Sequence, residues 1–234
     1  MAQFTETERR RLEAVYRRNR ERWAEGELPV SELYHLELFN AAVARSGIAV
    51  PPLFPVGSAA NAGLLYVLFR LAWEFPGLSV LELGAGQSSL LLDALRVAGR
   101  VSAVTTLEHD ADWAARIGAR VGHEVRHAAL CPVEVAGIVT PAYATALDRQ
   151  FDCVIVDGPI GTPTHSRLGA LALIEHHLAD DFVLVFDDAE RPGERQTIER
   201  CLDLYPKARH VCVHAMKSQC LVFTEKFAAL ASFA

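Results

Sequence analysis

The pattern of hydrophobic and polar positions divides the chain at residue 79. Before that point, apolar residues recur every three or four positions, which is the spacing of a helix that buries one face. Three helices are predicted there: one after the capping-box pair Thr5 and Glu8, one from Ser31 to Gly47, and one from Ser58 to Phe75. The predicted core faces of the first two helices consist of Leu12, Val15, Tyr16 and Trp23, and of Leu33, Leu36, Phe39 and Val43.

From residue 79 onward, short apolar runs alternate with helical patterns. Strands are predicted at 80–83, 101–107, 124–129, 151–156 and 182–186, and helices at 90–97, 112–121, 166–178 and 194–205. This alternation is typical of a parallel sheet with helices on both faces. Two final strands, at 210–214 and 220–224, are too close for a crossover helix and must form an antiparallel hairpin. We therefore predict an α/β fold with a mostly parallel seven-stranded sheet (residues 79–234) and an N-terminal helical segment (residues 1–78).

Composition narrows the class of protein. The 234 residues suit one α/β domain, and 51% of them are hydrophobic. The formal net charge of −6 argues against a nucleic-acid partner. The longest apolar stretch, Ala62 to Trp73, is too short to cross a membrane. Five cysteines without a C-x-x-C pair are expected to be reduced core residues, so a cytoplasmic protein is predicted.

The strongest motif stands where the first strand ends and the next helix begins, in the segment LELGAGQSS (residues 81–89). Gly84 and Gly86 let a ligand approach the backbone closely, and the helix start offers free N–H groups. Glu82 would repel a pyrophosphate but suits a ligand with an α-amino group. Ser89 occupies the place of the third glycine of a dinucleotide-binding motif. The ligand-binding residues predicted in this segment are Glu82, Gly84, Ala85, Gly86, Ser88 and Ser89.

A second candidate is Glu108, which ends the second strand 24 positions after Gly84. A carboxylate there can accept both hydroxyls of an adenosine ribose. Asp110 or Asp112 can cap the following helix in its place. The neighbouring His109 is included with the ligand-binding residues, and a bystander role is its alternative.

Two further strands bring carboxylates to the same edge of the sheet. Asp157 follows the buried run 151–156, and Asp187 and Asp188 follow the run 182–186. In open α/β folds ligands bind at this carboxyl edge. Close carboxylates repel one another, so a positive group should offset them. Mg²⁺ would do so with oxygen ligands, and Arg191 or Arg195 is the alternative.

In the order of these strand-end residues, the chain resembles class I S-adenosylmethionine-dependent methyltransferases. It is most similar to the small O-methyltransferases related to catechol and caffeoyl-CoA methyltransferases. The resemblance implies that residues 81–84 hold the methionine part of S-adenosylmethionine and that Glu108 holds its ribose. It also implies a divalent metal, here Mg²⁺, on Asp157, Asp187 and Asp188.

The chain departs from that family in three places. Asp188 stands where the metal-dependent enzymes usually have asparagine, and no lysine follows Asp157 closely to serve as base. His165 and Arg167 are the nearest polar candidates. Asp157 and His165 are therefore the predicted catalytic residues, with a solvated loop histidine as the alternative for His165. The end of the third strand also lacks the acid or amide that many relatives direct at the adenine.

The sequence thus predicts S-adenosylmethionine-dependent methyl transfer to a small-molecule hydroxyl. A nicotinamide-dependent oxidoreductase and a non-catalytic S-adenosylmethionine-binding protein are the alternatives, and the C-terminal hairpin counts against the first. The aromatic residues before residue 79 line an acceptor cavity, form a homodimer contact, or pack on the sheet. These residues are Tyr16, Trp23 and Phe54. The Arg-rich face of the first helix, from Arg9 to Arg22, is either solvated or directed at an anion or a partner.

Overall fold

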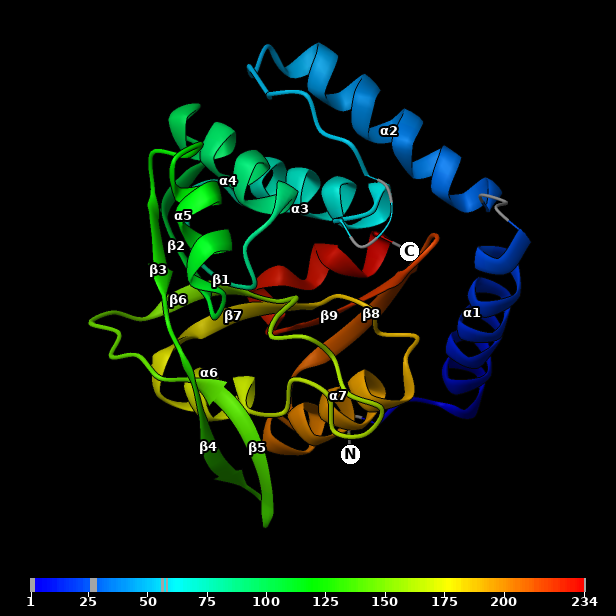
Figure 1. Cartoon of the computed structure of the whole chain (residues 1–234). Coiled ribbons are helices and arrows are strands. Elements are labelled where there is room, and N and C mark those ends of the chain that lie inside the picture. Colours follow the sequence, from blue (N-terminus) through cyan, green and yellow to red (C-terminus); the bar gives the residue numbers. More distant parts are fainter. Residues whose placement is uncertain (1–2, 26–28, 56, 58, 234) are drawn as a thin grey trace.

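A seven-stranded sheet forms the centre of the molecule, with helices on both faces (Figure 1). The computed structural model describes residues 3–25, 29–55, 57 and 59–233. Across the sheet the strands follow the order β3 (Glu124–His127), β2 (Val101–Glu108), β1 (Leu78–Leu83), β6 (Phe151–Val156), β7 (Leu178–Phe186), β9 (Ser218–Phe223) and β8 (Arg209–His214). The first five strands in this order pair in parallel, and β9 pairs antiparallel with both β7 and β8. The predicted parallel sheet and its closing hairpin are confirmed.

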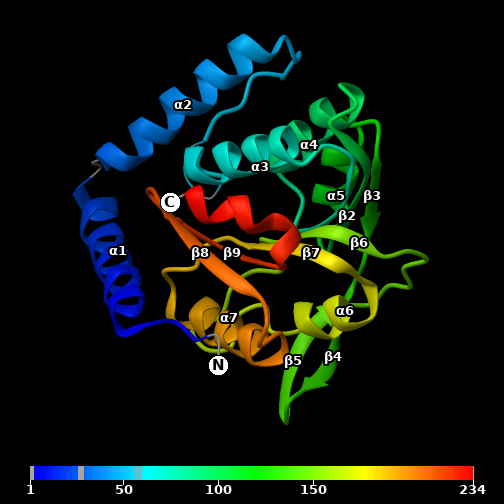
Figure 2. The same ribbon diagram turned by 180° about the vertical axis from the view of Figure 1, so that it is seen from behind.

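The central strands are apolar on both faces because each face is covered. On β1, Leu81 and Leu83 belong to one hydrophobic cluster, and Leu78 and Val80 belong to the cluster on the opposite face. One face carries α3 (Ala62–Glu74), α4 (Gln87–Val97), α5 (Ala111–Gly118) and the 3-10 segment η1 (Glu225–Ser232). The other face carries α6 (Ala170–His177) and α7 (Pro192–Leu204), as Figure 2 shows from behind.

The first helix, α1 (Glu6–Glu25), lies against α7 and the β8–β9 hairpin. The predicted capping box is present, since Glu8 accepts from the Thr5 backbone N–H at 2.7 Å. Leu12 and Val15 are buried as predicted, and Tyr16 is half-buried. The Trp23 side chain lies outside the described residues.

The second helix, α2 (Val30–Ser46), packs on α3 with a face that agrees only in part with the predicted one. Phe39 is buried as predicted, and Leu36 and Val43 are half-buried. Leu33 is 50% exposed, whereas Glu32, His35 and Phe39 are buried. The Glu32 carboxylate accepts from the backbone N–H of Ala62 at 2.6 Å, at the start of α3. A carboxylate at a helix N-terminus is stabilised by the free N–H groups and the helix dipole, so the helix turns Glu32 inward.

An unpredicted hairpin connects β3 to β6. It consists of β4 (Leu130–Val135) and β5 (Ile138–Tyr143), which pair only with each other. Ala136 and Gly137, both at positive φ, form its two-residue turn. Pro132 and Pro141 stand opposite each other in this hairpin, and proline weakens a strand prediction because it cannot donate to a ladder.

Several predicted boundaries shift by a few residues. The third helix begins at Ala62 after its cap Asn61, and Ser58 lies outside the described residues. Helix α6 begins at Ala170 instead of residue 166, and β7 begins at Leu178 instead of residue 182.

All five cysteines are free, and four of them are buried. Within the described part of the chain, no helix combines the length and the apolar character needed to cross a membrane.

Candidate active site

The glycine loop after β1 lies at the centre of the sheet's carboxyl edge. The chain order reverses between β1 and β6, and ligands bind at such points in open α/β folds. Gly84 has φ +97°, and a Cβ there would lie 2.9 Å from the backbone nitrogen of Gly158. Glycine is therefore required because the loops after β1 and β6 pack together, in addition to the predicted close approach of a ligand. A Cβ on Gly86 would meet nothing nearer than 3.9 Å.

Glu82 is fully buried behind this loop. Its Oε2 accepts from the Ser89 hydroxyl at 2.6 Å and from the Thr106 hydroxyl at 2.7 Å. Its Oε1 is buried and has no hydrogen-bond partner. Burial raises the pKa of Glu82 to about 7. A cationic group beside Oε1 would complete this site. The Ser88, Ser89 and Thr106 hydroxyls act against this rise of the Glu82 pKa, and both serines are buried in the first turn of α4.

Glu108 ties the glycine loop to the turn after β2. One carboxylate oxygen accepts from the Ala85 N–H at 3.0 Å, and the other accepts from the backbone N–H groups of His109 and Asp110. The His109 ring nitrogen Nδ1 lies 2.8 Å from Glu108. Asp110 caps α5 through the Trp113 N–H, as the sequence suggested, so Glu108 is not needed as the cap.

Tyr143 is a site residue that sequence analysis did not find. It ends the β4–β5 hairpin, its side chain is buried, and its hydroxyl lies against Gly158 without a hydrogen-bond partner. Its ring meets His109 edge to face at 6.4 Å. Burial and the nearby Glu108 carboxylate raise the pKa of Tyr143. No motif marks this tyrosine, since only the hairpin brings it to the glycine loop.

The three predicted carboxylates converge. Oxygen atoms of Asp157, Asp187 and Asp188 lie within 4.8 Å of one another. Strands β6 and β7 are adjacent and parallel, so the residues that follow them meet at the same edge. The geometric part of the prediction is confirmed.

Two buried cations occupy this cluster. Arg167 donates to Asp188 at 3.1 Å and lies 3.4 Å from Asp157. Lys217 donates to Asp187 at 3.2 Å and lies 3.5 Å from Asp188. Sequence analysis missed Lys217, because it stands 30 residues from Asp187 at the turn of the β8–β9 hairpin.

The arginines proposed as offsetting charges have different partners. Arg191 lies 3.0 Å from Asp188, so this alternative is confirmed. Arg195 forms an ion pair with Glu13 of α1 at 3.1 Å, so the alternative is wrong for Arg195. Arg195 lies about one helical turn beyond Arg191, and its side chain therefore reaches α1.

The pKa values of the acidic residues in and beside this cluster shift in different directions. Burial and the neighbouring Asp187 raise the pKa of Asp157 well above its usual value. For Asp187 burial acts in the same direction, but the Lys217 ammonium and the Gln219 amide together hold its pKa below the usual value. Burial beside Asp188 raises the pKa of Glu190 to about 8. The ionised Asp187 thus depends on Lys217.

The cluster as folded does not fit a divalent metal. Mg²⁺ requires carboxylate oxygens that are free to coordinate it. Asp187 Oδ1 accepts from Gln219 at 2.7 Å, and Oδ2 accepts from Lys217. Asp188 is bonded to Arg167. The ammonium and guanidinium groups already supply the positive charge that the metal was expected to provide, and they would repel a second cation.

His165 does not join the cluster. Its backbone N–H donates to the Gln196 side chain at 2.8 Å, and its ring Nδ1 is buried without a partner. Arg167, two residues later, reaches the carboxylates instead. The role of His165 as general base stays a prediction.

A cavity of about 500 Å³ adjoins the carboxylate cluster. It is lined by Tyr16, Asn19 and Arg20 of α1 together with Gly57, Glu190, Arg191 and Lys217. The cavity is within the usual size range of small-molecule sites. Tyr16 lines this cavity, which agrees with one of the alternatives that the sequence left open for it. Phe54 is 67% exposed, and its backbone bonds to the side chain of Gln87 at the start of α4.

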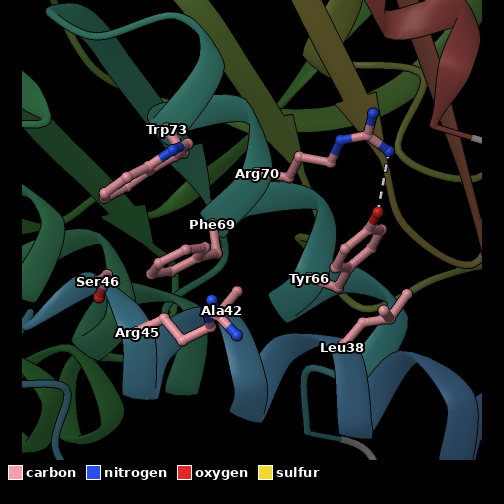
Figure 3. A pocket seen from close by; sticks show the side chains of 8 residues that line it. All are labelled: Leu38, Ala42, Arg45, Ser46, Tyr66, Phe69, Arg70 and Trp73. Carbon is pink, nitrogen blue, oxygen red and sulfur yellow. Dashed lines mark hydrogen bonds between the residues drawn. The ribbon is translucent and has the colours of Figure 1, made fainter.

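A second cavity of about 320 Å³ lies between α2 and α3 (Figure 3). Phe69 and Trp73 stack beside it, and Arg70 donates to the Tyr66 hydroxyl at 2.9 Å. Arg70 also bonds to Glu74 at 2.6 Å. None of the predicted site residues lines this cavity.

The sheet order and the loops at its carboxyl edge define the class of fold. The chain has the Rossmann-like fold of class I S-adenosylmethionine-dependent methyltransferases. It is similar to the T. thermophilus 16S rRNA N2 G1207 methyltransferase RsmC, solved with AdoMet and guanosine, at TM-score 0.52 and 16% identity. The similarity covers 75% of this chain and 46% of RsmC, so the chain spans about half the length of that protein.

Two other solved structures are less similar in shape. The Podospora anserina methyltransferase PaMTH1, bound to SAH, has TM-score 0.48 and 14% identity, with 95% of this chain and 97% of that chain covered. The O-methyltransferase from Bacillus cereus, in complex with SAH, has TM-score 0.45 and 14% identity, with 82% and 91% covered. No protein-family model matches the chain, and no curated protein matches its sequence.

Proposed function

We propose that this protein is an S-adenosylmethionine-dependent methyltransferase that methylates an oxygen atom of a small molecule. The observation that carries the proposal is the Glu82 carboxylate, buried behind the glycine loop with one oxygen unpartnered. An α-amino group provides the missing charge and hydrogen bond. A dinucleotide would bring a pyrophosphate to this place, where a carboxylate is unfavourable.

The other donor contacts follow from the same edge of the sheet. Free N–H groups at the start of α4, with Ser88, bind the methionine carboxylate. Glu108 binds the ribose hydroxyls, with His109 beside it, after exchanging its hydrogen bond to Ala85. Asp157 lies next to the glycine loop through the contact of Gly84 with Gly158. S-adenosylmethionine, when bound, supplies an electrophilic methyl group on its sulfonium.

The residues of the chain then align the donor with the acceptor and exclude water, which is the main requirement of methyl transfer. The cavity beside the carboxylate cluster has room for a small acceptor. The net charge of −6 disfavours a nucleic-acid acceptor. No divalent metal takes part, because Lys217 and Arg167 occupy the carboxylates.

Calorimetric titration tests the proposal. We expect S-adenosylhomocysteine to bind the wild-type protein and NADH not to bind. Glu82→Gln should weaken S-adenosylhomocysteine binding, while Glu37→Gln on α2 should not. Binding of NADH in preference to S-adenosylhomocysteine would contradict the proposal. Binding without methyl transfer to any acceptor from a broad hydroxyl and carboxylate panel would favour the non-catalytic alternative.

A further inference from the structure

Lys217 connects the carboxylate cluster to the cavity beneath α1. It stands at the turn between β8 and β9, its residue is only 6% exposed, and it still lines the cavity. Its ammonium donates to Asp187 at 3.2 Å and to the Ala59 carbonyl at 3.4 Å. The ammonium also lies 3.5 Å from Asp188, so its three N–H donors face two carboxylates and a carbonyl at the edge of the cavity.

The cavity wall is rich in positive charge. Arg20, Arg191 and Lys217 line it, and Glu190 is the only acidic residue among its lining residues. Arg20 forms no ion pair within the described part of the chain, and its guanidinium lies 6.0 Å from the centre of the Tyr16 ring. The Glu190 carboxylate accepts from the Ser218 N–H at 2.7 Å, so one of its oxygens is directed to the backbone. Arg191 and Lys217 also pair with Asp188 and Asp187, so Arg20 is the wall cation without an ion-pair partner among the described residues.

The carboxylate cluster connects this cavity to the donor loop through a series of contacts. Lys217 contacts Asp187, Asp187 converges with Asp157, and Asp157 precedes the glycine that packs on Gly84. Lys217 and the glycine loop thus lie at the same edge of the sheet and are connected through the carboxylate cluster.

We propose that this cavity is the acceptor site and that Lys217 binds the acceptor as an anionic oxygen, taking the place of a metal ion. The acceptor class is a small aromatic compound with a carboxylate or an acidic phenol, whose ring packs on Tyr16. The inference rests on the proposed methyl transfer. The anionic oxygen forms the new bond to the methyl carbon while the carbon–sulfur bond breaks. The electron pair of the broken bond stays on sulfur. The products are a methyl ester or aryl methyl ether and neutral S-adenosylhomocysteine.

In this arrangement a general base is not required. An acceptor that binds as an anion has no proton to lose during transfer. The ammonium lowers the cost of bringing that anion into a buried site, in the way that a bound metal would. His165, whose backbone N–H donates to Gln196, is then not required as a base.

Binding of aromatic acids and their amides tests the acceptor site. Protein saturated with S-adenosylhomocysteine is titrated with benzoate, salicylate and 4-hydroxybenzoate, and with the three corresponding amides. We expect at least one acid to bind about tenfold or more tightly than its amide, as for a charge-assisted contact. Lys217→Met should remove that preference and Lys217→Arg should retain most of it. Lys226→Met, an exposed lysine on η1, serves as the matched control.

Loss of a buried counter-ion can also unfold a protein, so a second variant is needed. Arg20→Gln changes an exposed residue of the same wall and should weaken acid binding several-fold with the melting temperature unchanged. Equal binding of acids and amides, or no saturable acid binding at all, would overturn the acceptor proposal. A preference for acids that survives in Lys217→Met would overturn the role of Lys217.

Metal titration completes the test. After EDTA treatment, MnCl₂ should give no saturable heat with the wild-type protein, and its melting temperature should stay the same. Saturable Mn²⁺ binding that Asp187→Asn abolishes would contradict the inference. S-adenosylhomocysteine is titrated into the same samples. If it fails to bind while acids bind in a Lys217-dependent way, the proposed function fails and the anion site stands.

Discussion

At the scale of single residues, Glu82 has an unusual set of hydrogen bonds. One carboxylate oxygen accepts from two hydroxyls, and the other has no hydrogen-bond partner. Because burial raises its pKa to about 7, much of it is protonated in the free protein below that pH. A ligand α-amino group requires the ionised form, so binding must release a proton at lower pH. We expect S-adenosylhomocysteine affinity to rise as the pH increases from about 5.5 to about 7.5 and then to level off.

Titrations in two buffers with different ionisation heats measure the released proton directly. The Glu82→Gln variant should bind more weakly at every pH and show a flat profile over this range. A wild-type affinity that is independent of pH, with no proton released, would mean that Glu82 does not face the amino group.

Glu108 has both a structural and a ligand-binding consequence. Glu108→Ala should weaken S-adenosylhomocysteine binding by about 1.5–3 kcal/mol through the lost ribose contacts. It should also lower the free energy of unfolding by about 1–3 kcal/mol, because it removes the acceptor for the N–H groups of Ala85, His109 and Asp110. Calorimetry and urea unfolding measure the two effects. Glu124→Ala, an exposed position on β3, is the control, and unchanged affinity in Glu108→Ala would remove Glu108 from the donor site.

At the scale of elements, the β4–β5 hairpin replaces a crossover helix and brings Tyr143 to the glycine loop. Its buried hydroxyl lacks a partner, which costs free energy in the empty protein. We expect this hydroxyl to find its partner in the bound donor, so Tyr143→Phe should weaken S-adenosylhomocysteine binding several-fold while leaving stability unchanged or slightly higher. Calorimetry and thermal unfolding measure both, with Tyr34→Phe on the exposed face of α2 as control. Tighter binding by Tyr143→Phe would show that the phenol obstructs the site.

The elements also show which features a sequence can predict. Parallel strands align their ends, so Asp157, Asp187 and Asp188 could be placed together from strand positions alone. The contacts of α2 could not be predicted in this way, because Glu32 accepts a hydrogen bond from Met216, which lies 184 residues further along the chain. The ion pair of Lys217 with Asp187 could not be predicted either, because it depends on how the last hairpin packs. Local patterns predict elements and their edges, while long-range pairing of charges requires the assembled fold.

At the scale of the whole molecule, the N-terminal segment closes one side of the acceptor cavity. Deleting residues 1–25 removes Tyr16, Asn19 and Arg20 from its wall and uncovers the cluster that contains Leu12. We expect the truncated protein to have a lower melting temperature, to keep S-adenosylhomocysteine binding, and to lose binding of aromatic acids. The measurements are thermal unfolding and the two titrations on the same sample. A folded truncation that retains full affinity for the acids would place the acceptor elsewhere.

The position of β9 between β7 and β8 has a consequence for the growing chain on the ribosome. Synthesis proceeds from the N-terminus, so all three carboxylates emerge before Lys217 does. A nascent chain stopped after β8 would have β7 as an open edge and Asp187 without its ammonium. Completion of the sheet beside β7 and pairing of Asp187 with its ammonium thus both depend on the last hairpin.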